Sequence, residues 1–162
     1  MTANTISLTH FYKGWDVYQQ HLVTAITPLT SAQLTLRSAP HMWSVGMLAT
    51  HIVATRASWF HRWMGEGGPE MALIDEWDER SEPTRPAAEL VAGLESTWQM
   101  IQQALAHWTP ADLAQEFQNP YVAGKPARSR QWIIWHLLEH DLHHGGELSL
   151  TLGMHGVAAL DL

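Results

Sequence analysis

The sequence of 162 residues predicts an all-α protein, a four-helix bundle with long connections between its helices. Four segments repeat apolar residues every three or four positions, the period of a helix that buries one face. No segment alternates apolar and polar residues as a half-buried strand does, and no internal repeat is present. We therefore expect one domain over residues 1–162, with four helices around a single core.

The first helix is predicted over residues 8–26, where tyrosine, tryptophan and leucine side chains form the apolar stripe. Residues 28–43 are rich in proline, serine and threonine, which is typical of a connection. The second helix is expected to begin after Ser44, because serine caps helix N-termini well. It is expected to run to about Met64, where the glycine-rich residues 65–69 would end it.

The acidic residues 75–84 are expected to form a solvated connection. Thr84 is the expected cap of the third helix, with Pro86 at an early position that tolerates proline, and the helix is expected to run to about Trp108.

A second connection rich in proline and glycine follows the third helix. The fourth helix is then predicted to open at Ser129, to run to about Leu152 and to stop at Gly153. Both inner connections are long for a simple up-and-down bundle, so crossovers are expected.

The composition excludes several classes of partner. The net charge is −7 and the nine Lys and Arg residues are scattered singly, which argues against nucleic acid. No apolar run approaches the length of a membrane span, and the N-terminus has no signal-peptide pattern, so we expect a cytoplasmic protein. The absence of cysteine excludes thiolate metal sites and a cysteine nucleophile. With only 15% charged residues, part of the surface is expected to be covered in a homodimer.

Four of the eleven histidines lie in the nine residues 136–144. Histidines four apart on a helix project from the same face, and the run offers two such pairs, His136/His140 and His140/His144. On a helical wheel with His136 at zero, His140 lies near about 40° and His144 near about 80°, at the border of the aliphatic face. This favours His140 and His144 as the inward pair.

His51, about two turns into the second helix, is the expected third donor, because side chains of facing helices build sites in a bundle core. Three histidines leave coordination positions open for water or substrate. The donor set suits a divalent metal ion, with Zn, Ni, Fe and Mn all open. The remaining alternatives are that His136 or His143 replaces a proposed ligand.

Several neighbours of the cluster are candidates for supporting roles. Glu147 is the candidate catalytic residue: it could orient a ligand, act as a general base on bound water, or serve as a fourth ligand. Gly145 and Gly146 are costly inside a helix, which indicates close helix approach, a bend or a simple local break in the helix. Most tryptophans fall at core spacing, but Trp43 and Trp135 lie beside the expected site.

The sequence resembles the DinB/YfiT-like superfamily of four-helix-bundle metalloenzymes with a three-histidine site. The similarity lies in residues 43–51, in residues 136–147 and in the closing Leu152-Gly153. The resemblance implies His51 as the first ligand and His140 and His144 as the pair. Many members continue the last histidine with Arg-Gly-Gln, whereas this chain has Gly-Gly-Glu at residues 145–147.

The resemblance implies a metal-dependent enzyme acting on a small molecule, either a hydrolase or an S-transferase that uses a low-molecular-weight thiol. In such an enzyme the ion activates a coordinated water or thiol as the nucleophile. The alternative is a non-catalytic bundle that binds metal or a small ligand, and a third interpretation is that the histidines are merely structural.

Overall fold

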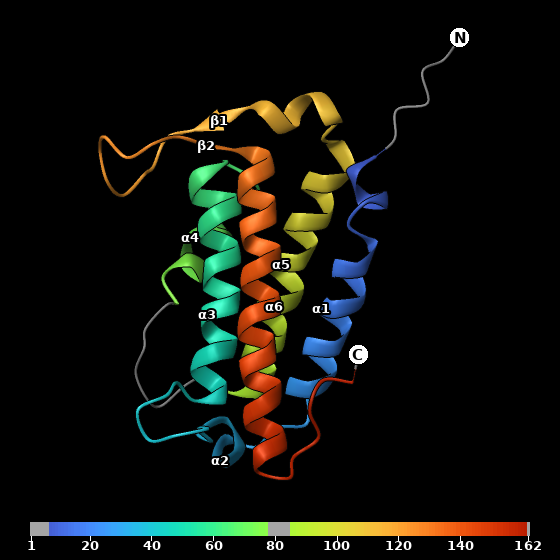
Figure 1. The fold of residues 1–162 in the computed structure, drawn as a ribbon, viewed down its shortest axis with the longest axis vertical. Coiled ribbons are helices and arrows are strands. Elements are labelled where there is room, and N and C mark those ends of the chain that lie inside the picture. Colours follow the sequence, from blue (N-terminus) through green and yellow to red (C-terminus); the bar gives the residue numbers. More distant parts are fainter. Residues whose placement is uncertain (1–6, 78–84, 162) are drawn as a thin grey trace.

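The computed structural model describes residues 7–77 and 85–161, and it confirms the predicted all-α bundle (Figure 1). The four long helices are α1 (Lys13–Ile26), α3 (Val45–Ala57), α5 (Ala87–His107) and α6 (Arg130–Met154). The other elements are short: η1 (Leu8–His10), α2 (Ser31–Leu34), η2 (Ser58–Trp63), α4 (Glu70–Asp75), η3 (Pro110–Ala114), β1 (Glu116–Phe117) and β2 (Arg128–Ser129). Among the described residues, no helix is long and apolar enough to cross a membrane.

The order of the helices in space requires one crossover. In Figure 1, α3 and α5 run in one direction, whereas α1 and α6 run in the opposite direction. The chain between α3 and α5 therefore returns from one end of the bundle to the other, as predicted. The expected second crossover is wrong, because α5 and α6 are antiparallel and β1 pairs with β2 at the end where they meet. Two-residue strands are too short to leave an alternating pattern in the sequence.

The two serine caps lie where the sequence predicts them. The Ser44 hydroxyl oxygen accepts a hydrogen bond from the Met47 backbone N–H at 3.3 Å, at the start of α3. The Ser129 hydroxyl oxygen accepts one from the Trp132 N–H at 3.2 Å, at the start of α6. The predicted cap at Thr84 lies outside the described residues. Pro86 directly precedes α5 instead of lying inside it.

Several other helix boundaries differ from the predicted ones. The first helix is divided into η1 and α1, because a 3₁₀ turn keeps nearly the same apolar spacing as an α-helix and the pattern does not reveal the break. The second helix changes into the π-helical η2 before it ends. The predicted connection over residues 28–43 contains α2, and α4 lies between the predicted stop at residues 65–69 and the acidic connection. The fourth helix passes Gly153, and the left-handed residue that follows its end is Gly156, with φ of 68°.

The core lies between the four long helices, with α3 packed against both α5 and α6 and α1 packed against α5. The aliphatic residues that the wheel placed on the inner face of α6 are all fully buried: Ile133, Leu137, Leu148 and Leu152. They meet buried side chains of the other helices, including Leu22, Ile52, Leu94 and Ile101. The packing of α3 on α6 brings the two helices that carry the predicted ligands face to face.

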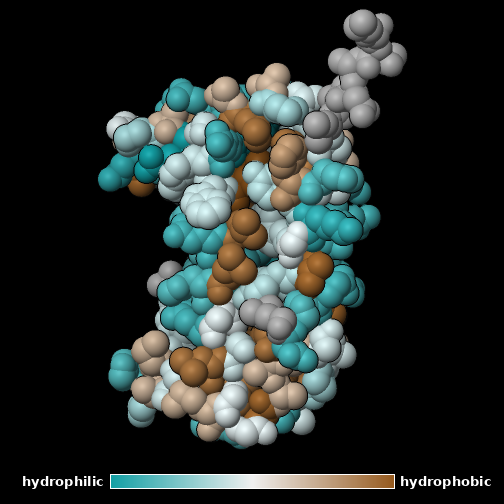
Figure 2. Space-filling model, turned by 45° about the vertical axis from the view of Figure 1, so that its right-hand side comes forward, coloured by the Kyte–Doolittle hydropathy of each residue, from teal (hydrophilic) through white to brown (hydrophobic). Residues whose placement is uncertain are grey.

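A second apolar stripe on α6 faces outward. Trp135 and Leu142 are 62% and 48% exposed, and Leu138 between them is partly buried. These residues lie three and four positions apart, so they share one face of the helix. Figure 2 shows apolar side chains gathered in a band down the molecule. This α6 stripe is an apolar surface that the described chain leaves uncovered.

The paired glycines of α6 have different surroundings. A Cβ at Gly145 would overlap the hydroxyl oxygen of Tyr18 on α1 and would lie 3.0 Å from the tyrosine Cζ, whereas a Cβ at Gly146 would meet nothing within 4 Å. The predicted reason for the pair, close helix approach, therefore applies to Gly145 alone.

We expect Gly145→Ala to lower the free energy of unfolding by about 1–3 kcal/mol relative to Gly146→Ala. Both substitutions share the gain in helix propensity, so the difference isolates the cost of overpacking. Urea denaturation of the two variants measures it, and equal stabilities would contradict the close approach of Tyr18. Adding Tyr18→Phe to Gly145→Ala should recover part of the loss.

Candidate metal centre

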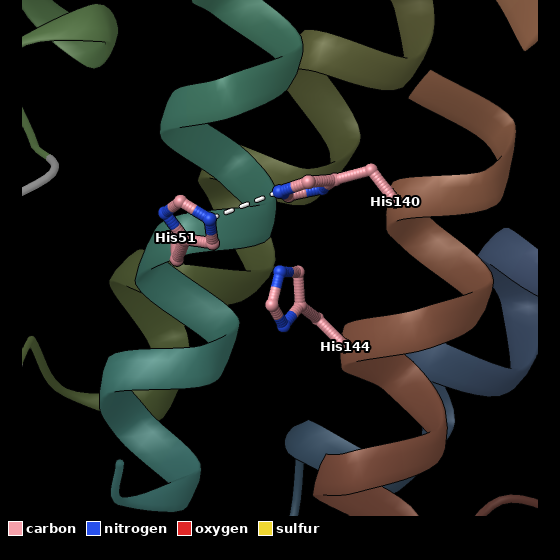
Figure 3. A group of neighbouring side chains, drawn as sticks. All are labelled: His51, His140 and His144. Atoms are coloured by element: carbon pink, nitrogen blue, oxygen red, sulfur yellow. Dashed lines mark hydrogen bonds between the residues drawn. The ribbon is translucent and has the colours of Figure 1, made fainter. Parts of the chain in front are cut away.

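Three histidines from two helices converge in the groove between α3 and α6. His51 lies in the second turn of α3, and His140 and His144 lie one turn apart on α6. One ligand atom from each lies within 4.8 Å of the other two. Figure 3 shows the three imidazole rings turned toward one another in the space between the helices. The structure thus brings together the three residues that the sequence singles out.

His140 presents a ring nitrogen to the interior of this histidine triad. Its Nε2 lies 2.9 Å from the Nε2 of His51, so the two rings point their nitrogens at the same space. Burial, followed by the neighbouring His144 and His51, lowers the pKa of His140 to about 2. The imidazole is therefore neutral at neutral pH and keeps a lone pair on the unprotonated nitrogen, which is the form that binds a metal ion.

His144 is oriented by a carboxylate of its own helix. Its Nδ1 lies 2.7 Å from Oε2 of Glu147, a hydrogen bond in which the imidazole N–H donates to the carboxylate. This contact places the proton on Nδ1 and leaves the Nε2 lone pair for the interior of the triad. Burial is the largest influence on His144 and lowers its pKa, although the Glu147 hydrogen bond acts in the opposite direction. Of the three roles expected for Glu147, the geometry provides orientation of a ligand.

Trp43 closes one side of the triad. Its ring stacks on His144 with centroids 5.8 Å apart and meets His51 edge-on at 4.9 Å. A cavity of about 330 Å³ adjoins this wall. Its lining comes from the segment before α3, from α3 and from α6: Ser38, His41, Met42, Trp43, Leu48, His144, Glu147, Leu150 and Thr151. The cavity, called the Trp43 cavity below, reaches the triad through His144.

The other histidines and the second tryptophan near the cluster lie elsewhere. His136 stacks on Trp132 at 4.7 Å and also contacts Trp59, one turn away from the triad. His143 is exposed, although its Nε2 comes within 3.6 Å of Glu147. Trp135 belongs to the outward α6 stripe. His41 lines the Trp43 cavity, whereas His155 contacts the Arg37 carbonyl oxygen at the end of α6 and does not line the cavity.

A second group of donor atoms overlaps the triad. His143, His144 and Glu147 also place one ligand atom each within 4.8 Å of the others. All three lie on one stretch of α6, and His143 is largely exposed. The group shares His144 with the triad, and its Glu147 oxygen already accepts from that ring. The triad, with its donors from two helices, is the better enclosed of the two.

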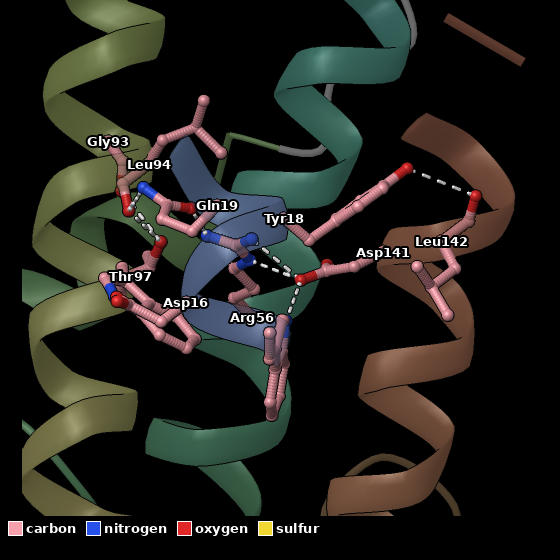
Figure 4. A network of polar contacts seen from close by, with 11 residues as sticks. Asp16, Tyr18, Gln19, Arg56, Gly93, Leu94, Thr97, Asp141 and Leu142 are labelled. Atoms are coloured by element: carbon pink, nitrogen blue, oxygen red, sulfur yellow. Dashed lines mark hydrogen bonds and ion pairs between the residues drawn. The ribbon is translucent and has the colours of Figure 1, made fainter. Parts of the chain in front are cut away.

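A buried ion pair lies beside the triad and was not predicted. Arg56 of α3 and Asp141 of α6 are both 0% exposed, and the guanidinium Nη2 lies 2.7 Å from Oδ2 of Asp141. Arg56 Nε donates to the same oxygen at 2.9 Å, and the indole N–H of Trp15 on α1 donates to it at 2.7 Å. Asp141 is the residue after His140, so this ion pair joins α1, α3 and α6 next to a proposed ligand (Figure 4).

The polar network continues away from the triad. Arg56 Nη1 donates to the Gln19 side-chain oxygen at 2.6 Å, and the Gln19 amide donates to the Leu94 carbonyl oxygen of α5 at 3.2 Å. Burial and the Asp141 carboxylate raise the pKa of Tyr18 to about 12, and its hydroxyl donates to the Leu142 carbonyl oxygen. In the sequence, Arg56 is an isolated charge, whereas Asp141 is one of several carboxylates near the histidine cluster. The signal available was a lone arginine inside the apolar pattern of residues 45–57.

This arrangement can hold a divalent cation with three imidazole nitrogen donors. No thiolate is present, and the nearest carboxylate is engaged with His144. The chemistry that such a centre supports is activation of a coordinated oxygen or sulfur atom.

Comparison with known proteins agrees with the fold. The model of the DinB superfamily matches residues 11–148, a range that includes all three members of the triad. A DinB-like protein from Bacillus cereus ATCC 10987 has a similar crystal structure, with a TM-score of 0.74 and 19% sequence identity over 98% of this chain and 99% of that chain. At this identity, the likeness shows a shared fold. No curated protein matches the chain.

Proposed function

The chain belongs to the DinB superfamily, and from this membership we propose that it is a metal-dependent enzyme whose divalent cation is held by His51, His140 and His144. The proposed reaction is hydrolysis or transfer of a low-molecular-weight thiol to a small-molecule substrate. The convergence of three imidazoles from α3 and α6 on one point, with ligand atoms within 4.8 Å of one another, carries this proposal.

Two features of the donor set fit a divalent cation. The pKa values of His140 and His144 are lowered, so both rings are neutral, and neutral imidazole suits Zn, Ni, Fe and Mn alike. The Nε2 atoms of His140 and His51 lie 2.9 Å apart, a hydrogen bond in which one ring N–H donates to the other ring, and a cation bound by both atoms would take the place of that proton. A bound divalent cation would lower the pKa of a coordinated water or thiol and so supply a nucleophile near neutral pH.

The residues around the triad would orient His144, accept a proton and limit the access of water. Oε2 of Glu147 keeps the proton of His144 on Nδ1 and fixes the direction of its Nε2. Glu147 also lines the Trp43 cavity, so its other oxygen is available to accept the proton that a nucleophile releases. Trp43 covers His51 and His144 and limits access of bulk water from that side.

The reaction is tested with metal-restored protein and two panels, one of electrophiles offered with low-molecular-weight thiols and one of esters and amides. We expect turnover in one panel that disappears in the His140→Ala/His144→Ala variant and survives in His136→Ala. Metal binding without turnover in either panel would favour the alternative, a non-catalytic bundle that binds metal or a small ligand. Turnover that persists in the double variant would refute the proposed site.

We also propose that the chain forms a homodimer through the α6 stripe of Trp135, Leu138 and Leu142. An exposed apolar stripe at helical spacing is a surface that a second helix can cover. The expected result is a mass near twice 18.3 kDa in light scattering and a melting temperature that falls on dilution. Leu142→Glu should give a monomer, and the control Leu73→Glu, at an exposed position of α4, should remain a dimer. A monomeric mass for the unchanged protein at every concentration would contradict the dimer.

A further inference from the structure

The Trp43 cavity combines mostly apolar walls with a single carboxylate. Its walls are mostly apolar, with Met42 and Trp43 from the segment before α3, Leu48 from α3 and Leu150 from α6. An apolar cavity of about 330 Å³ can enclose the body of a small molecule. His144 connects the cavity to the triad, and the other polar residues of the lining are Ser38, His41, Glu147 and Thr151.

Glu147 is the only residue with a carboxylate among those that line this cavity, and none of the lining residues is a lysine or an arginine. The two lining imidazoles, His41 and His144, are donors or acceptors without charge when neutral. Arg37 contacts the same segment, but its guanidinium donates to the Met42 carbonyl oxygen and contacts the Met47 sulfur, and Arg37 does not line the cavity.

From these observations we infer that the Trp43 cavity binds the apolar body of a neutral or cationic small molecule, and that Glu147 selects against anionic ones. The carboxylate side chain is about one third exposed, with Oε2 on His144 and Oε1 only 3.6 Å from the exposed His143. An ammonium or hydroxyl group of a ligand can approach it from the cavity, whereas an anion would meet repulsion in a partly apolar surrounding. That this ligand is a substrate rests on the proposed function, but binding of the ligand in the cavity does not require the metal.

The inference also restricts the thiol in the proposed transfer reaction. A thiol carrying several carboxylates would need cationic partners to offset desolvation, and the cavity offers none. A neutral thiol, or a neutral or cationic acceptor of the thiol, fits the observed lining. The Gly-Gly-Glu sequence at residues 145–147 is what gives this chain a carboxylate at that point.

The test uses three probes with the same apolar body and different charge: 2-phenylethylamine, 2-phenylethanol and 3-phenylpropanoate, each fluorinated on the ring. Dissociation constants are measured by ¹⁹F NMR on metal-free protein at pH 8, above the ordinary imidazole pKa of about 6.5, so that histidine charge does not contribute. We expect the amine to bind about tenfold more tightly than the carboxylate, because the same glutamate attracts one and repels the other. The alcohol should lie between them.

Three variants locate the effect. Glu147→Gln keeps the shape and an acceptor for His144, and it should bring the three probes to similar affinity. Leu150→Lys places a cation on a lining residue that is 63% exposed, one helical turn from Glu147, so it should offset the carboxylate and weaken the preference. Leu73→Lys adds the same charge on α4, at a residue that is 68% exposed and outside the cavity, and should leave the preference unchanged.

Equal or tighter binding of the carboxylate to the unchanged protein would overturn the inference, as would no measurable binding of any probe. A preference that survives Glu147→Gln, or that Leu73→Lys alters as much as Leu150→Lys does, would also overturn it. Repeating the titrations with metal-loaded protein separates coordination of the carboxylate from binding in the cavity. Because the main measurement uses metal-free protein, a failure of the metal proposal would leave this result standing, and the reverse also holds.

Discussion

Replacing His140 and His144 together with alanine is expected to abolish metal binding. Protein purified without a histidine tag should contain close to one equivalent of a divalent metal, whereas the double variant should contain almost none. Loss of an outer partner of a ligand already lowers metal affinity about 10–100-fold, so loss of two direct ligands should lower it by more. Elemental analysis after dialysis, together with competition against a chelator, measures the difference.

The chain provides a matched control for this experiment. The variant His136→Ala/His143→Ala removes two histidines from the same helix but leaves the triad complete. It should keep its metal. Loss of metal in this control alone would mean that His136 or His143 is a ligand. A metal content in the parent protein that is negligible and equal to that of the His140→Ala/His144→Ala variant would refute the site. A parent stoichiometry near two that falls to one in the control would indicate that the group of His143, His144 and Glu147 also binds an ion.

Breaking the buried Arg56–Asp141 ion pair is expected to have the largest effect on stability. In Asp141→Asn, the guanidinium of Arg56 stays fully buried and loses its counter-charge. Removing one partner of a buried pair typically costs about 3–5 kcal/mol, because the desolvation cost of the remaining charge is no longer offset. Urea denaturation of the variant should show a correspondingly lower midpoint.

Two controls separate the buried charge from the general effect of substitution. Glu89→Gln makes the same carboxylate-to-amide change in the partly exposed Arg85–Glu89 pair and should cost less than about 1 kcal/mol. Arg56→Met combined with Asp141→Leu removes both charges and should recover much of the loss, although Trp15 and Gln19 then lose their partners. A loss in Asp141→Asn no larger than that in Glu89→Gln would contradict the structural importance of the pair.

The fold was predictable where the signal is local and repetitive. The apolar stripes of α1 and α5 are continuous, α3 is buried on nearly all sides, and Ser44 and Ser129 cap their helices through hydrogen bonds to residues three positions ahead. The errors lie where the local signal is short or ambiguous. A four-residue helix such as α2 and two-residue strands such as β1 and β2 contain only about one period of their pattern. The end of α6 lies at Met154, past the predicted stop at Gly153, because a helix tolerates glycine at modest cost.

The triad was predictable because helical periodicity relates residues four apart regardless of tertiary structure. His140 and His144 had to share a face of their helix, and the border of the aliphatic stripe directed that face inward. The choice of His51 depended on two helices facing each other, and the resemblance to a known family supported it. The orientation of His144 by Glu147 was one of three expected roles, since residues three apart on a helix can always meet.

The sequence by itself therefore determined the class of fold, the caps of α3 and α6 and the histidines that could share a point in the core. Only the tertiary structure decided that Arg56 and Asp141, 85 positions apart, meet beside His140, and that Trp43 covers the triad. It alone also decided that Gly145, and not Gly146, receives a side chain from α1. The physical reason is that periodicity fixes the direction of a side chain within its own helix, whereas partners across helices depend on how separate helices pack.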